Sequence, residues 1–109
     1  MTNWFKNLFK RKANYVGKKV IVRADRAGVF YGTLAAKEGT EVELHHCRRL
    51  WYWSGAASIS QIAEEGVKYP NDCKFTISVN SIQIMGVIEI TPCTEIAIDN
   101  IESVAVWKK

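Results

Sequence analysis

Hydrophobic and polar positions change their spacing near residue 17, and this change divides the chain. In residues 2–12, apolar residues recur at helical spacing with basic residues between them. From residue 18 onward the spacing approaches two, which is typical of strands. We therefore predict a basic amphipathic N-terminal helix or arm over residues 1–16 and a single α+β domain over residues 17–109.

The first half of the domain predicts an antiparallel meander of three strands. A β-branched run indicates a strand over residues 19–24, and strands are also expected over residues 29–37 and 41–53. Turn residues separate them, with Gly28 free to adopt positive φ in the first turn.

The second half mixes helical and strand patterns. Ser58 and Gln61 match a capping box, so a helix is expected to begin there and to end at Gly66. Thr94 is expected to cap a second short helix that runs to about residue 102.

Further strands are expected between and after these helices. Residues 74–79 alternate as a half-buried strand, and a turn near residues 80–81 leads into a strand over residues 82–90 that is bulged at Gly86. Residues 104–107 add a final strand. The expected fold is thus α+β, a mainly antiparallel β-sheet with an N-terminal amphipathic helix and two short helices.

Charge favours anionic partners, but it is unevenly placed. The formal net charge is +4 and the isoelectric point is about 9.1. Much of the excess lies in the first 19 residues and in Lys108 and Lys109, so the middle of the chain is near neutral, which argues against a long nucleic-acid groove. The arm has two open roles: a membrane-surface helix, or packing on its own domain or a neighbouring subunit, which we favour.

Composition indicates a cytoplasmic protein that does not span a membrane. The longest apolar runs fall short of the roughly 20 residues that a spanning helix needs. The three cysteines are widely separated, with no Cys-x-x-Cys pair, which is typical of reduced thiols.

Residues 48–58 are the strongest candidate for a binding site. Arg48 and Arg49 stand beside three aromatic rings, and a run of small residues follows them. The guanidinium group of arginine binds phosphate through paired hydrogen bonds, and aromatic rings stack on nucleotide bases. The helix that follows begins with free backbone amides, which also attract anions. The alternative is that Trp51 and Trp53 are core aromatics and that the arginines are solvated.

Arg23 and Arg26 flank the first turn and extend this hypothesis. If Arg23 and Arg48 lie on neighbouring strands, several arginines and rings would meet one nucleotide, although the register is open. The alternative for Arg26 is a turn with an internal ion pair to Asp25.

Catalytic and metal chemistry find little support. Neighbouring residues on a strand point to opposite faces, so His45 and His46 are poorly placed to share a metal, and Cys47 to use His46 as a base. Glu64 and Glu65 are consecutive on the expected helix, so their side chains point in different directions and are poorly placed to act as a paired acid and base. The chain also lacks the common phosphate-loop, hydrolase and zinc-protease motifs. We expect a binding protein rather than an enzyme, with no cofactor and no metal.

Three segments resemble a family of small phage proteins, the Thoeris anti-defence sponges. They are residues 22–30, 47–58 and 86–90, and the resemblance covers about residues 20–107, with Arg-Arg-Leu-Trp-Tyr-Trp as its most specific part. It implies a non-enzymatic protein that sequesters cyclic ADP-ribose isomers made by bacterial TIR-domain immune enzymes. Such proteins hold the signal intact in recessed pockets of a homo-oligomer, a hexamer in some members, and some also bind cyclic oligonucleotides at a separate site.

The resemblance also implies roles for particular residues. Phosphate or ribose contacts fall to the arginines and stacking contacts to the rings, and the expected ligand-binding residues are Arg23, Arg26, Phe30, Arg48, Arg49, Trp51 and Trp53. A dimeric pocket would enclose the ligand on both faces. The alternative function is a small basic β-rich module that binds single-stranded nucleic acid, and a hydrolase of the same signals is a third possibility.

Overall fold

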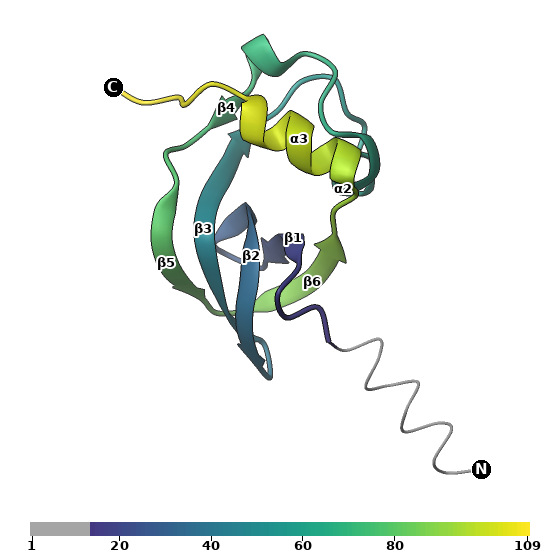
Figure 1. The fold of residues 1–109 in the computed structure, drawn as a ribbon. Coiled ribbons are helices and arrows are strands. Elements are labelled where there is room, and N and C mark those ends of the chain that lie inside the picture. The colour runs from purple at the N-terminus through teal and green to yellow at the C-terminus, as the bar shows by residue number, and fades with distance from the viewer. Residues whose placement is uncertain (1–13) are drawn as a thin grey trace, which may run out of the picture.

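The computed structural model describes residues 14–109. The predicted N-terminal helix or arm over residues 1–16 therefore lies almost entirely outside the described residues, and residues 14–16 are not helical. The described domain is a mostly antiparallel β-sheet with two α-helices packed on it, so the α+β class is confirmed (Figure 1).

The sheet contains six strands in the order β4-β3-β2-β1-β6, and β5 also pairs with β3. All of these pairs are antiparallel. The strands are β1 (Lys19–Ala24), β2 (Gly28–Glu38), β3 (Glu41–Tyr52), β4 (Lys74–Phe75), β5 (Val79–Ile84) and β6 (Val87–Pro92). The helices are α2 (Ile59–Glu65), the 3-10 turn η1 (Pro70–Asp72) and α3 (Glu95–Ser103).

The sheet curls strongly because its two ends are tied together. β5 lies beyond β3 and β6 lies beyond β1, yet only Met85 and Gly86 separate these two strands in sequence (Figure 1). The inner face of the curl encloses one hydrophobic core, the inner core. A second core, the outer core, lies between the outer face of the sheet and the helices α2 and α3. Val20 and Val22 point into the first core and Ile21 into the second, which explains three consecutive buried residues.

The first three strands and both helix starts are confirmed to within a residue or two. The Ser58 hydroxyl accepts the Gln61 amide at 3.2 Å, and the Thr94 hydroxyl accepts the Ala97 amide at 3.1 Å. Each helix therefore begins directly after the residue whose side chain accepts a hydrogen bond from a free backbone amide.

The strand boundaries after residue 74 were predicted wrongly. β4 has only two residues, the expected turn near residues 80–81 lies inside β5, and the chain turns instead at Gly86, whose φ is 75°. The alternating pattern runs on through residues 74–79 because β4 and β5 use the same edge of β3 at two separate places.

Arg48 ties β3 to the segments that cross its end. Its side chain is buried, with 7% exposed, and it donates to four backbone carbonyls. These are Thr76 O at 2.9 Å, Ile101 O at 2.9 Å, Phe75 O at 3.2 Å and Ala105 O at 3.4 Å. Burial lowers the pKa of Arg48 below its ordinary value, but the four carbonyls solvate the cation and the last turn of α3 favours positive charge.

Replacing Arg48 by Met should destabilise the protein by about 3 kcal/mol or more, because buried carbonyls lose their donors. Urea unfolding followed by circular dichroism measures this. Arg26→Met is the matched control at an exposed turn, where an effect within about 0.5 kcal/mol is expected. Equal unfolding midpoints for the two variants would show that the Arg48 network contributes little to stability.

Candidate functional site

Neighbouring residues of β3 carry the candidate chemistry to opposite sides of the sheet. Arg48 is buried beneath α3, whereas Arg49 and Trp51 are exposed on the other side. The two adjacent arginines therefore cannot bind the same phosphate group. This follows directly from the alternation of side chains along a strand.

Trp51 and Trp107 form an exposed stack. Their ring centroids lie 6.3 Å apart and their planes differ by 5°. Trp51 is 62% exposed and Trp107 is 38% exposed. We call Trp51, Tyr52, Lys74 and Trp107 the aromatic face.

Lys74 places a positive charge over these rings. Its Nζ atom lies 5.5 Å from the centroid of Trp107 and 6.0 Å from the centroid of Tyr52. Cation–π attraction favours this position. The aromatic face thus combines flat apolar surfaces with an ammonium group.

Trp107 is held in place by the backbone beside it. Its amide donates to Phe75 O at 2.9 Å, and Val106 forms a parallel bridge with Phe75. Trp107, Tyr52 and Lys74 are not among the site residues predicted from the sequence. The run Trp107-Lys108-Lys109 repeats the mixture of ring and cation seen at residues 48–53, and this was the available signal.

Arg49 packs on Phe30 rather than standing free. Its Cζ lies 4.6 Å from the ring centroid, and its Nη1 donates to Ala27 O at 3.0 Å. Phe30 is 1% exposed and belongs to the inner core. Arg49 remains exposed and keeps donors for an anion, whereas Phe30 offers little ring surface for stacking.

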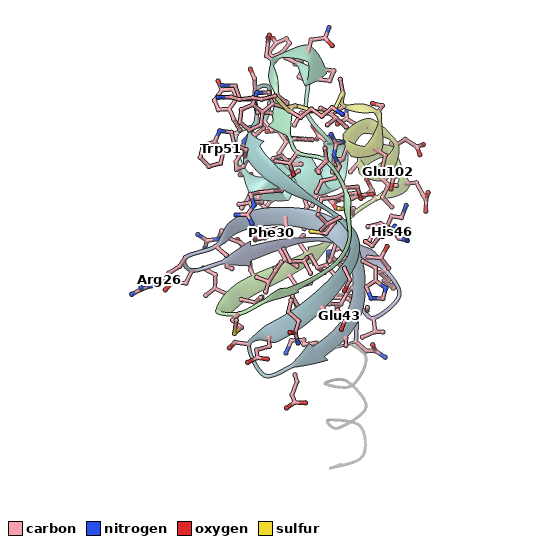
Figure 2. All side chains as sticks on the ribbon, turned by 90° about the vertical axis from the view of Figure 1, so that its left-hand side faces the viewer. Arg26, Phe30, Glu43, His46, Trp51 and Glu102 are labelled. Atoms are coloured by element: carbon pink, nitrogen blue, oxygen red, sulfur yellow. The ribbon has the colours of Figure 1, made fainter. Side chains whose placement is uncertain are left out.

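The arginines of the first turn stand apart from Arg48. β2 lies between β1 and β3, so the condition that Arg23 and Arg48 occupy neighbouring strands is not met. Arg23 Nε donates to Glu89 at 2.7 Å, which compensates its charge. Arg26 lies at the outer tip of the β1–β2 turn and points away from the molecule (Figure 2). The four arginines do not converge within one chain.

Trp53 is half-buried and packs against the outer core. Of the three adjacent aromatic residues, Trp51 and Tyr52 are the exposed ones. The core alternative weighed for both tryptophans thus describes Trp53 and not Trp51.

Thiol and metal chemistry are weakly supported in the part of the chain that the structure describes. Burial raises the pKa of Cys47 and of Cys93 to about 12, so both thiols stay protonated near neutral pH. His45 Nε2 lies 2.6 Å from a Glu43 carboxylate oxygen. Residues 14–109 hold no cluster of three or more side chains suited to a metal ion.

A membrane-crossing helix is not found among residues 14–109, since neither α2 nor α3 is long and apolar enough.

Comparison with known proteins identifies the family. No curated protein and no solved structure is detectably similar to this chain. The family described as "Domain of unknown function (DUF6948)" matches residues 17–101. The match includes every strand, α2 and most of α3, and it stops before Trp107. The chain is therefore a member of the DUF6948 family.

Proposed function

We propose that this protein binds cyclic nucleotide signals and sequesters them without degrading them. The exposed stack of Trp51 and Trp107, with Lys74 beside it, is the observation that carries this proposal. A base stacking on an aromatic side chain gains about 1–3 kcal/mol. The ammonium group and the exposed Arg49 offer partners for phosphate.

The charge distribution favours a small ligand over a long strand. All 11 Asp and Glu residues lie in residues 14–109, whereas four of the 15 Lys and Arg residues precede residue 14. The domain that carries the aromatic face is therefore electrically neutral overall. A compact ligand that meets a few local cations fits this surface better than a polyanion that needs an extended positive track.

Tight sequestration requires more contact than one open face provides. A nanomolar dissociation constant corresponds to about −12 kcal/mol, several times the gain from one base stack. A second copy of the chain placed over the aromatic face would supply the other wall of a pocket. We therefore propose a homo-oligomer with ligands held between subunits, a hexamer as in some of the phage sponges that the sequence resembles. The ligands would be cyclic ADP-ribose isomers, with cyclic oligonucleotides as a further class, and the protein would act in the cytoplasm of the infected cell.

Binding of single-stranded nucleic acid is the second candidate. It is favoured by the open position of Trp51 and Trp107, because sequence-tolerant strand binders also present successive rings to bases.

Trp51→Ala should weaken cyclic nucleotide binding about 5- to 150-fold, since it removes one base stack worth about 1–3 kcal/mol. Isothermal titration calorimetry with cyclic ADP-ribose isomers and cyclic di- and trinucleotides measures this. Tyr69→Ala, which removes an exposed ring outside the aromatic face, is the matched control. If the wild-type protein binds none of these nucleotides, or returns them chemically altered after denaturation, the sequestration proposal fails.

Salt dependence separates the two candidates. For a cyclic nucleotide, raising salt from 50 to 200 mM should weaken binding less than about threefold, because few counterions are released. For a 12-nucleotide single strand that makes five phosphate contacts, the same change in salt should lower the binding affinity on the order of 100-fold. Fluorescence anisotropy with labelled ligands distinguishes these outcomes. A steep loss of affinity for the single-stranded nucleic acid as salt rises, together with no binding of small nucleotides, would favour the second candidate.

A further inference from the structure

The outer edge of β5 is open. This strand pairs with β3 on one side, and Figure 1 shows it at the left-hand margin of the molecule with no helix or strand to its left. In an antiparallel pair, every second residue turns its N–H and C=O groups away from the neighbouring strand. Within residues 14–109, these outward groups of residues 79–84 have no backbone partner. The edge is therefore a free template for one more strand.

β5 carries none of the features that usually protect an edge strand. Proteins blunt open edges with charged residues, prolines and bulges. Residues 79–84 contain no charge and no proline, and they keep one register with β3 along the whole strand. Four of the six side chains are exposed, and Ile77 and Met85, which flank the strand, are 50% and 66% exposed. An exposed strand of this composition has a strong tendency to pair with another.

The other strands at the ends of the sheet are protected. In β6, Glu89 is paired with Arg23, the strand ends at Pro92, which lacks an N–H donor, and its pairing with β1 contains a register shift. β4 is only two residues long, and Val106 bridges its Phe75. Among the strands within residues 14–109, β5 is thus the one whose open edge is long, regular and uncharged.

The composition of β5 favours a second copy of the same strand as its partner. Like charges that lie opposite each other destabilise a strand pair, and residues 75–88 contain no charged side chain. Two identical strands can therefore face each other without repulsion. Antiparallel pairing across a two-fold axis at Ser81 would place it opposite Ser81 of the partner subunit, and serines in such a pair form favourable hydrogen bonds.

We propose that β5 pairs antiparallel with β5 of a second copy of this chain across a two-fold axis, so that the two sheets become one continuous sheet. Backbone hydrogen bonds would supply most of the affinity, as in other cases of strand addition. This inference goes beyond the proposed function, because β5 shares no residue with the aromatic face and the pairing needs no nucleotide. A hexamer with two-fold and three-fold axes would use this contact and a separate contact at the aromatic face.

Sedimentation equilibrium of the full chain without nucleotide tests the pairing. The wild-type protein should have a mass that is an even multiple of the 12.4 kDa chain. Ser81→Lys should halve that mass, because two lysines would face each other across the axis. Ser60→Lys adds the same charge at an exposed position on α2, and it should keep the wild-type mass. A monomeric wild type, or a Ser81→Lys variant of wild-type mass, would overturn the proposal.

Mixing variants of opposite charge identifies the contact. Ser81→Glu alone should also halve the mass, whereas an equimolar mixture with Ser81→Lys should restore it, because opposite charges then meet across the axis. Circular dichroism shows whether each variant keeps the fold. Asn80→Lys and Asn80→Glu repeat the test at a neighbouring exposed position if a Ser81 variant does not fold. A mixture of folded variants that stays at the halved mass would reject pairing between two β5 strands, whether or not the protein binds nucleotides.

Discussion

The buried guanidinium of Arg48 is the interaction on which the rest of the structure depends. A charged group with 7% exposure is costly to bury unless its donors find partners, and four carbonyls from three different segments accept four of its five N–H groups. The last turn of α3, the strand β4 and the chain near Ala105 are thereby drawn to one point on β3. A hydrophobic residue of similar size would fill the space without ordering these carbonyls.

The aromatic face follows from this arrangement. Because the chain beyond α3 is held against Phe75, Trp107 comes to lie on Trp51 and completes the aromatic face. Arg48, which the sequence suggests as a phosphate-binding residue, thus contributes to the proposed site by positioning other groups.

A neutral domain with local rings and cations suits a compact ligand that carries both bases and phosphates. The open position of the aromatic face is an energetic liability for an isolated chain, since large exposed rings favour association. A second subunit and an enclosed ligand would remove that liability together. In this proposal, assembly and ligand binding have the same physical cause, the burial of Trp51 and Trp107.

The sequence by itself determined the elements that depend on local chemistry: the three-stranded meander, whose β-branched runs and turns are short-range signals, and the helix starts at Ser58 and Thr94, where one side chain satisfies one amide. Tertiary structure decided what depends on partners far along the chain. The division of β4 from β5 came from two docking places on β3, and the burial of Arg48 came from carbonyls about 30 to 60 residues away. The stacking of Trp107 on Trp51 is of the same kind, because sequence patterns report the period of a strand and not which distant segment will cover it.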